Sequence, residues 1–116
     1  MNSSEAANWM ISNYRIEDFN SGDAYVVIQH RSWLKEDQVK LADYFLGNIP
    51  HVTNRGYKAF LTFMSLPRFL RVIEKKIPKK REDRELLKYY LYPLLKNHPE
   101  SQKHQKLIKD ILSKIE

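Results

Sequence analysis

The segment Leu66 to Ile77, LPRFLRVIEKKI, carries its apolar residues at the spacing of one face of an α-helix. At about 100° per residue these side chains form one narrow stripe, and basic side chains occupy the opposite side. Ser65 is placed to cap the helix, and Pro67 lies in the first turn, where proline is tolerated. The stripe comprises Leu66, Phe69, Leu70, Ile73 and Ile77, and the basic side comprises Arg68, Arg71 and Lys75. A helix with one buried and one charged face is therefore predicted.

Helical spacing recurs along the rest of the chain. The other predicted helices cover Glu5 to Phe19, Lys35 to Asn48, Tyr57 to Met64, Glu82 to His98, and Pro99 to about residue 115. Ser32 is the expected cap of the helix from Lys35. Pro93 is expected to kink or break the helix from Glu82, because proline removes a backbone donor. The side chains of Trp9 and Trp33 are expected in the core.

The segment Ala24 to Leu34 contains AYVVI, a run rich in strand-forming residues. No second alternating run exists to pair with it, and an unpaired strand is not stable in water. With Asp23 as its N-cap, a helix is the better prediction. The sum is an all-α fold, a compact antiparallel bundle of six to seven short helices. The 116 residues fit a single domain, residues 1–116, with its core at about 5–98 and an amphipathic C-terminal helix at about 99–115.

Residue types and motifs argue against several kinds of site. The chain has no cysteine, which rules out disulfides and cysteine-based zinc sites, and its four histidines are scattered. The common nucleotide-binding and hydrolase motifs do not occur in the sequence. We therefore expect no enzyme activity, no metal and no cofactor. The N-terminus lacks the pattern of a secretory signal and no stretch approaches membrane-spanning length, so a cytoplasmic protein without membrane contact is expected.

The excess of positive charge is confined to the C-terminal part of the chain. Residues 1–67 contain six Lys/Arg against seven Asp/Glu, whereas residues 68–116 contain fourteen against seven, a net charge of +7. The densest run, IPKKREDRELLK, holds the possible polyanion-binding residues Lys79, Lys80, Arg81 and Arg84. The favoured alternative is a solvated loop and helix start whose charge is offset by Glu82, Asp83 and Glu85, since no groove-reading motif accompanies the run.

Three tyrosines, Tyr89, Tyr90 and Tyr92, follow the basic run. Aromatic side chains beside cations can stack on the bases of single-stranded nucleic acid. The favoured interpretation places them at the buried margin of a helix with their hydroxyls in water.

The stretch NRGYKAFLTFM, from Asn54 to Met64, places Arg55-Gly56 before a helix with Ala59-Phe60 near its start. In this arrangement the sequence resembles a caspase-recruitment domain (CARD) of the death-fold superfamily, in which a helix ending in apolar residues precedes an Arg-Gly pair and an Ala-aromatic pair. The similarity covers roughly residues 35–77. The charged tail is similar in texture to the segment after a CARD in the cytosolic viral-RNA-sensing helicases and their invertebrate relatives.

This resemblance implies a six-helix Greek-key bundle that acts without catalysis. Such domains associate homotypically or heterotypically, in apoptotic, innate-immune or RNA-silencing assemblies, through complementary charged surfaces. Here the acidic candidates are Glu36, Asp37 and Asp43, and the basic candidates are Arg68, Arg71, Lys75, Lys76 and Arg55. Opposite patches on different faces would permit head-to-tail self-association. For each residue the alternative is the solvent face of an amphipathic helix.

Two other functions remain open at this point. The basic C-terminal half is compatible with a nucleic-acid-binding domain. A small accessory or immunity protein that binds and neutralises an acidic partner is not separated by the sequence from a CARD-like module. Gly56 is expected to be a structural hinge, a tight corner between the helix from Lys35 and the helix from Tyr57, because it lacks a Cβ.

Overall fold

A computed structural model of the chain describes residues 2–14, 27–29, 31–47 and 55–116. These residues contain helices, turns and irregular segments and no strand, which confirms the predicted all-α fold. The helices are α1 (Ser3–Asn13), α4 (Lys35–Phe45), α5 (Arg55–Leu61), α6 (Leu66–Glu74), α7 (Arg81–Lys96) and α8 (Gln105–Ile115). A further helical turn covers residues 27–29.

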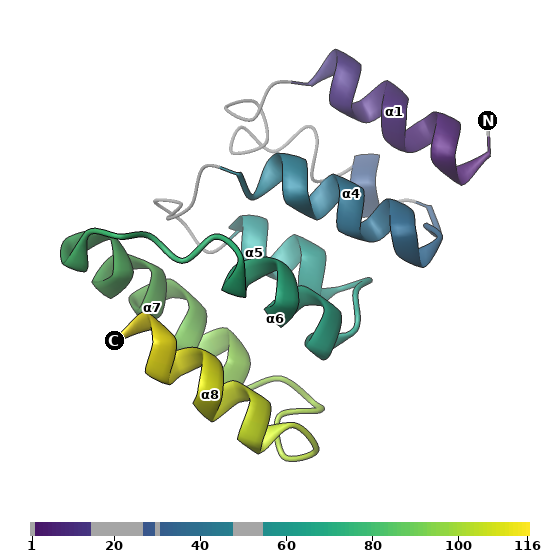
Figure 1. Cartoon of the computed structure of the whole chain (residues 1–116). Helices are drawn as coiled ribbons and strands as arrows, with labels where there is room; N and C mark the ends of the chain where they lie inside the picture. The colour runs from purple at the N-terminus through teal and green to yellow at the C-terminus, as the bar shows by residue number, and fades with distance from the viewer. Residues whose placement is uncertain (1, 15–26, 30, 48–54) are drawn as a thin grey trace.

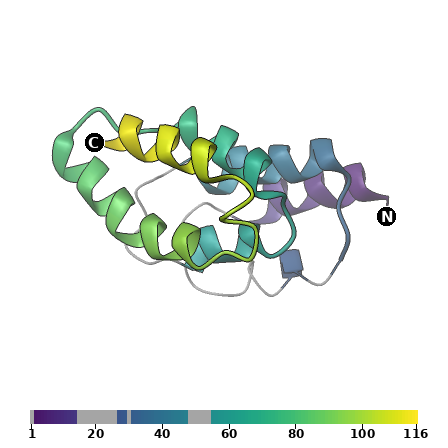
Figure 2. The same ribbon diagram turned by 90° about the horizontal axis from the view of Figure 1, so that it is seen from below.

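The helices form two layers. In Figure 1, α1, α4, α6 and α8 lie side by side, and Figure 2 shows α5 and α7 in a second layer beneath them. The helices of the first layer run in the same direction, and the chain returns through the second layer after α4 and after α6. Helices that follow one another from α4 to α8 are therefore antiparallel. The Greek-key order of a death fold stays a prediction.

Polar contacts fix the parallel register of the first layer. Between α1 and α4, Ser3 bonds to Asp37 and Lys40 bonds to Asn8, so the partners advance together along both helices. Between α4 and α6 the same holds for the pairs Gln38–Arg68 and Asp43–Lys76. These polar contacts set the alignment of the helices, while apolar burial supplies the stability.

The α6 helix follows its predicted pattern closely. Its Ser65 cap accepts a hydrogen bond from the Arg68 amide at 3.3 Å, and Pro67 lies in the first turn. The predicted stripe is buried except for Ile77, which is half-buried and lies beyond the helix, because α6 ends at Glu74. The buried residues of α6 are Leu66, Phe69, Leu70, Val72 and Ile73. They join residues of all the other helices in one apolar core.

Helix α1 differs from its prediction at both ends. It begins at Ser3, capped by the Asn2 side chain, which accepts from the Glu5 amide at 2.8 Å. It ends at Asn13, whereas the prediction extended to Phe19; residues 15–19 lie outside the described part of the chain. The predicted burial of Trp9 is wrong, because this side chain is 44% exposed while the buried face of α1 consists of Ala6, Ala7 and Met10.

Of the helix predicted from Ala24 to Leu34, the structure describes residues 27–29 and 31–34, and only residues 27–29 are helical. The predicted cap, Asp23, lies outside the described residues. Residues 31–34 are not helical. Trp33 is buried, as predicted, and its indole nitrogen donates to the Ile28 carbonyl at 2.8 Å. The predicted Ser32 cap of α4 is wrong: Leu34 occupies the cap position without a side-chain bond.

Proline acts differently from the prediction in the C-terminal part. Pro93 lies inside α7, which runs unbroken from Arg81 to Lys96, so a break at this residue is excluded. Pro99 does not open a helix, and α8 begins only at Gln105. Residues 99–104 form turns instead, in which the Glu100 amide donates to His98 Nδ1 at 3.1 Å. The predicted apolar face of α8 is confirmed, with Ile111 and Ile115 buried.

Gly56 is the second residue of α5 and is buried. The predicted corner between helices is therefore displaced, because α5 already includes Arg55 and Gly56 and ends at Leu61. The neighbouring Tyr57 and Phe60 are fully buried. A glycine inside the first turn of a buried helix lets the adjoining backbone or side chains pack closely, which differs from the role of a hinge.

Candidate functional site

The basic residues predicted on α6 fall into two groups. The guanidinium of Arg68 is half-buried and donates to Gln38 Oε1 at 3.2 Å, and the Lys76 ammonium lies 3.8 Å from Asp43 Oδ1. Both contacts reach α4 and belong to the packing of the first layer. In contrast, Arg71 and Lys75 are exposed, and no described residue forms an ion pair with either. Arg55 is also exposed, but it lies at the start of α5 in the second layer.

The predicted acidic surface on α4 is largely used within the chain. Asp37 is only 4% exposed, and its carboxylate accepts from the Ser3 hydroxyl at 2.6 Å, so its assignment to a partner-binding face is wrong. Asp43 takes part in the ion pair with Lys76. Glu36, in the first turn of α4, is the acidic candidate that stays exposed without a described partner.

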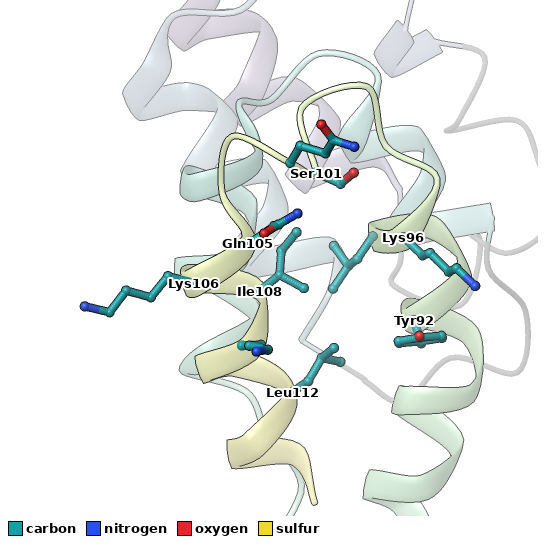
Figure 3. Close-up of a pocket in the computed structure, with 10 residues that line it drawn as sticks. Tyr92, Lys96, Ser101, Gln105, Lys106, Ile108 and Leu112 are labelled. Carbon is teal, nitrogen blue, oxygen red and sulfur yellow. The ribbon is translucent and has the colours of Figure 1, made fainter.

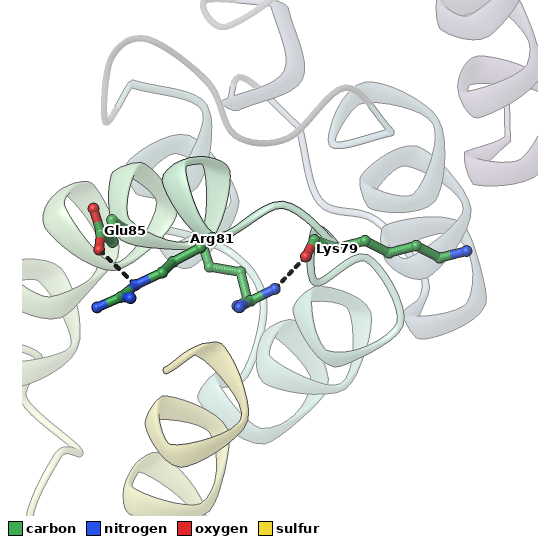
Figure 4. A network of polar contacts seen from close by, with 4 residues as sticks. Lys79, Arg81 and Glu85 are labelled. Carbon is green, nitrogen blue, oxygen red and sulfur yellow. Dashed lines mark hydrogen bonds and ion pairs between the residues drawn. The ribbon is translucent and has the colours of Figure 1, made fainter.

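In the connection from α6 to α7 and at the start of α7, polar contacts hold two arginines of the basic run in place (Figure 4). The Arg84 guanidinium donates to the carbonyls of Lys79 and Pro78, and the Arg81 guanidinium donates to Glu85 at 3.2 Å. These two arginines shape the turn and the first turns of α7. The side chains of Lys79 and Lys80 are exposed and have no acidic partner among the described residues. Together with Arg71 and Lys75 they form what we call the α6–α7 basic surface.

Two other cations link helices to the C-terminal helix. The Lys114 ammonium bonds to Glu74 at 2.6 Å and joins α8 to α6, and Lys88 bonds to Glu116 at 2.5 Å and joins α7 to the end of the chain. The hydrogen bond from Lys114 to Glu74, together with the charge of that carboxylate, raises the pKa of the Lys114 ammonium above 10.5. These residues position α8 on the stack.

A groove of about 630 Å³ lies between α7 and α8 and is open to solvent (Figure 3). One side is formed by Tyr92, Leu95 and Lys96 of α7, and the other by Gln105, Lys106, Ile108, Lys109 and Leu112 of α8, with Ser101 and Gln102 from the connecting turn. Leu95 is fully buried beneath the apolar floor of the groove. The three lining lysines, Lys96, Lys106 and Lys109, are exposed. None of the ten lining residues carries a carboxylate. We call this feature the α7–α8 groove.

Sequence reasoning missed the α7–α8 groove because it placed a helix directly after Pro99. The signal that was present is the alternation of lysine with apolar residues in Lys106, Ile108, Lys109 and Leu112. The groove needs the turns at residues 99–104, which place α8 beside the second half of α7.

The tyrosines of α7 do not share one environment. Tyr89 is 71% exposed and Tyr92 is 44% exposed, whereas Tyr90 is half-buried against the core. The rings of Tyr89 and Tyr90 meet edge to face with their centroids 5.1 Å apart. The expectation of a buried margin therefore fits Tyr90 and is wrong for Tyr89.

No family model matches the chain, and the comparisons with curated proteins and with solved structures found no match. Within the described residues, no group of three His, Asp or Glu side chains is arranged to hold a metal ion. None of the helices in this part of the chain combines the length and the apolar character needed to cross a membrane. The description of function therefore depends on the surfaces themselves.

Proposed function

We propose that the chain is a non-catalytic protein-binding module that captures an acidic partner through the α6–α7 basic surface. The observation that carries this proposal is the division of the cations into two classes. Several, among them Arg68, Lys76, Arg81 and Arg84, contact acceptors within the chain, while Arg71, Lys75, Lys79 and Lys80 are exposed without an acidic partner in the described residues. Cations that the fold leaves unpaired at one end of a helix pair are available to an acidic surface.

The charge distribution favours binding to a different protein over self-association. A homotypic contact needs an acidic face on the same chain. Of the three acidic candidates, only Glu36 stays exposed with no partner among the described residues, since Asp37 is buried and Asp43 contacts Lys76. The acidic face predicted on α4 thus offers one carboxylate without a described partner against four cations, so a heterotypic contact is the better prediction.

The proposal rests on surface chemistry and does not require the CARD resemblance, which stays a prediction. If the resemblance holds, the module acts in a cytoplasmic apoptotic, innate-immune or RNA-silencing assembly. A neutralising accessory protein would use the same basic surface. The two settings differ in the identity of the captured protein and not in the residues that capture it.

Affinity capture with the tagged chain tests the proposal. The double variant Arg71→Glu/Lys75→Glu reverses two of the four cations of the surface without touching the packing contacts of Arg68 and Lys76. We expect it to lose a partner that the unaltered chain retains, with affinity for the purified partner lowered at least about tenfold. A matched control is Lys35→Glu/Lys58→Glu, which makes the same change in net charge at exposed positions of α4 and α5. Equal capture by both variants would contradict the proposal.

A nucleic-acid-binding domain is the second candidate, favoured by one observation. Tyr89 and Tyr92 are exposed on α7, the helix that follows Lys79 and Lys80 in the chain. Exposed aromatic rings beside cations bind single strands by stacking. Titration of single-stranded and duplex RNA and DNA at two salt concentrations tests it, and the absence of binding at low salt removes it.

A further inference from the structure

The α7–α8 groove is separate from the α6–α7 basic surface and lies at the end of the helix stack. Helix α8 is the last member of the first layer, and it contacts α6 on one side and α7 on the other. The residues of α8 that line the groove recur at helical spacing from Gln105 to Leu112, about 12 Å along the axis. On α7, Tyr92, Leu95 and Lys96 form the facing row. The α8 row spans about two helical turns, and the α7 row from Tyr92 to Lys96 spans about one.

The floor of the groove is apolar. Leu95 is fully buried, and the half-buried Ile108 and Leu112 project between the two helices, as Figure 3 shows. In the helix-in-groove mode, such a trough receives apolar side chains spaced i, i+3 or i+4, and i+7 on a ligand helix. A nucleic-acid strand would place charged phosphates along the same floor and would find a single aromatic ring, that of Tyr92. The apolar floor therefore favours a helix.

The rim of the groove selects the charge of that helix. Lys96 lies on α7 and Lys106 on α8, at the two outer flanks of the groove, and in Figure 3 both side chains extend outwards into solvent; Lys109 is the third lining lysine and also belongs to α8. None of the three forms an ion pair with a described residue, and no lining residue is acidic. Three cations that flank an apolar floor from both sides complement a helix with an apolar stripe bordered by Asp and Glu.

We infer that the α7–α8 groove is a docking site for an acidic amphipathic helix of a partner protein. The helix seats its apolar residues on the half-buried Ile108 and Leu112, and its flanking carboxylates meet Lys96, Lys106 and Lys109. The bound helix extends the two-layer stack beyond α8. This site is independent of the α6–α7 basic surface, so either can fail without the other.

Fluorescence anisotropy with a synthetic peptide tests the inference. The probe is a labelled helical peptide of about 14 residues, with leucine at i, i+3 and i+7 and glutamate on the flanking positions. We expect saturable binding that weakens with added salt, since the rim contacts are exposed ion pairs. The triple variant Lys96→Glu/Lys106→Glu/Lys109→Glu should weaken binding at least about tenfold. A peptide with serine in place of the leucines should not bind.

Matched variants make each outcome decisive. Lys103→Glu alters an exposed lysine of the neighbouring turn that does not line the groove, and it should retain binding. Arg71→Glu/Lys75→Glu should also retain it, which separates this site from the proposed function. Replacing the three rim lysines with glutamine covers the case in which charge reversal disturbs the fold, as judged by circular dichroism. Absence of peptide binding, unchanged affinity in the triple variants, or tighter groove-dependent binding of single-stranded RNA would each overturn the inference.

Discussion

Ser3 of α1 joins two points of α4 at once. Its hydroxyl donates to Asp37 Oδ2 at 2.6 Å and accepts from the Leu34 amide at 2.9 Å. The first contact satisfies a carboxylate that is only 4% exposed, and the second satisfies a backbone donor at the start of α4 that no local side chain caps. A residue more than thirty positions away in the sequence thus satisfies the amide of the N-cap residue, and α1 and α4 are tied in parallel register.

Replacing Ser3 with alanine should lower the free energy of unfolding by about 1–3 kcal/mol, because Asp37 would keep a buried charge without its hydroxyl donor. Urea unfolding followed by circular dichroism measures the change. Ser4→Ala is the matched control, since Ser4 is exposed on the same turn and should stay within about 0.5 kcal/mol. Equal stability of both variants would show that the Ser3–Asp37 contact is not needed.

The contrast between α6 and α4 shows what the sequence could predict. The features that set α6 are local: Ser65, Pro67 and an apolar stripe lie within one segment, and the helix appears where they place it. The start of α4 depends on Ser3, which belongs to another helix, so the local candidate Ser32 was the wrong prediction. Sequence patterns within one segment can predict a helix such as α6. They cannot identify a side chain from another helix, such as Ser3, that bonds to the start of α4.

The predictions for Asp37, Asp43 and Lys76 missed contacts within the chain for the same reason. Helical periodicity in the sequence places Asp37 and Asp43 on the polar side of α4. It groups Lys76 with the basic residues at the end of α6. The fold then packs α4 against both α1 and α6, which buries Asp37 and pairs Asp43 with Lys76. Arg71 and Lys75, which face away from these contacts, kept their predicted exposure.

Pro93→Ala should stabilise the protein. Proline inside a helix costs roughly 3 kcal/mol relative to alanine, and α7 nevertheless continues because Leu91 and Leu95 are buried on either side of Pro93. Each buried leucine contributes about 1.5–3 kcal/mol, enough together to exceed that cost. Since Pro93 itself is exposed, alanine removes the cost without opening a cavity.

Thermal unfolding measures this effect, and the gain should approach about 3 kcal/mol at most. Tyr92→Ala, an exposed change at the adjacent position, controls for a general effect of alanine. A Pro93→Ala variant that is less stable than the unaltered chain would mean that the proline ring supports the packing of α7.

Gly56 gives a size-dependent test of close packing. Because it is buried in the first turn of α5, each added carbon meets the surrounding core. Gly56→Val should lower the free energy of unfolding by about 1–3 kcal/mol or more, and Gly56→Ala should lie between valine and the unaltered chain. Lys58→Ala on the exposed side of α5 is the control. If valine is tolerated without loss, neither close packing nor a corner explains the glycine.

The Lys114–Glu74 contact predicts a pH dependence at the alkaline end. The pKa of Lys114 is raised above 10.5 in the folded chain, chiefly by the hydrogen bond and charge of Glu74. A raised pKa means that the folded state binds this proton more tightly than the unfolded state. The stabilisation by the pair is therefore complete below pH 10.5 and is lost as the pH rises through the higher folded-state value.

Because Lys114 is exposed, this contribution is small and should decrease with added salt. NMR titration of the lysine side chains measures the pKa directly. Glu74→Gln should return the pKa of Lys114 towards 10.5, since a neutral amide removes the charge that holds the proton. Glu116→Gln removes the partner of Lys88 instead and should leave Lys114 unchanged. An unaltered Lys114 titration in Glu74→Gln would show that the link between α6 and α8 does not form in solution.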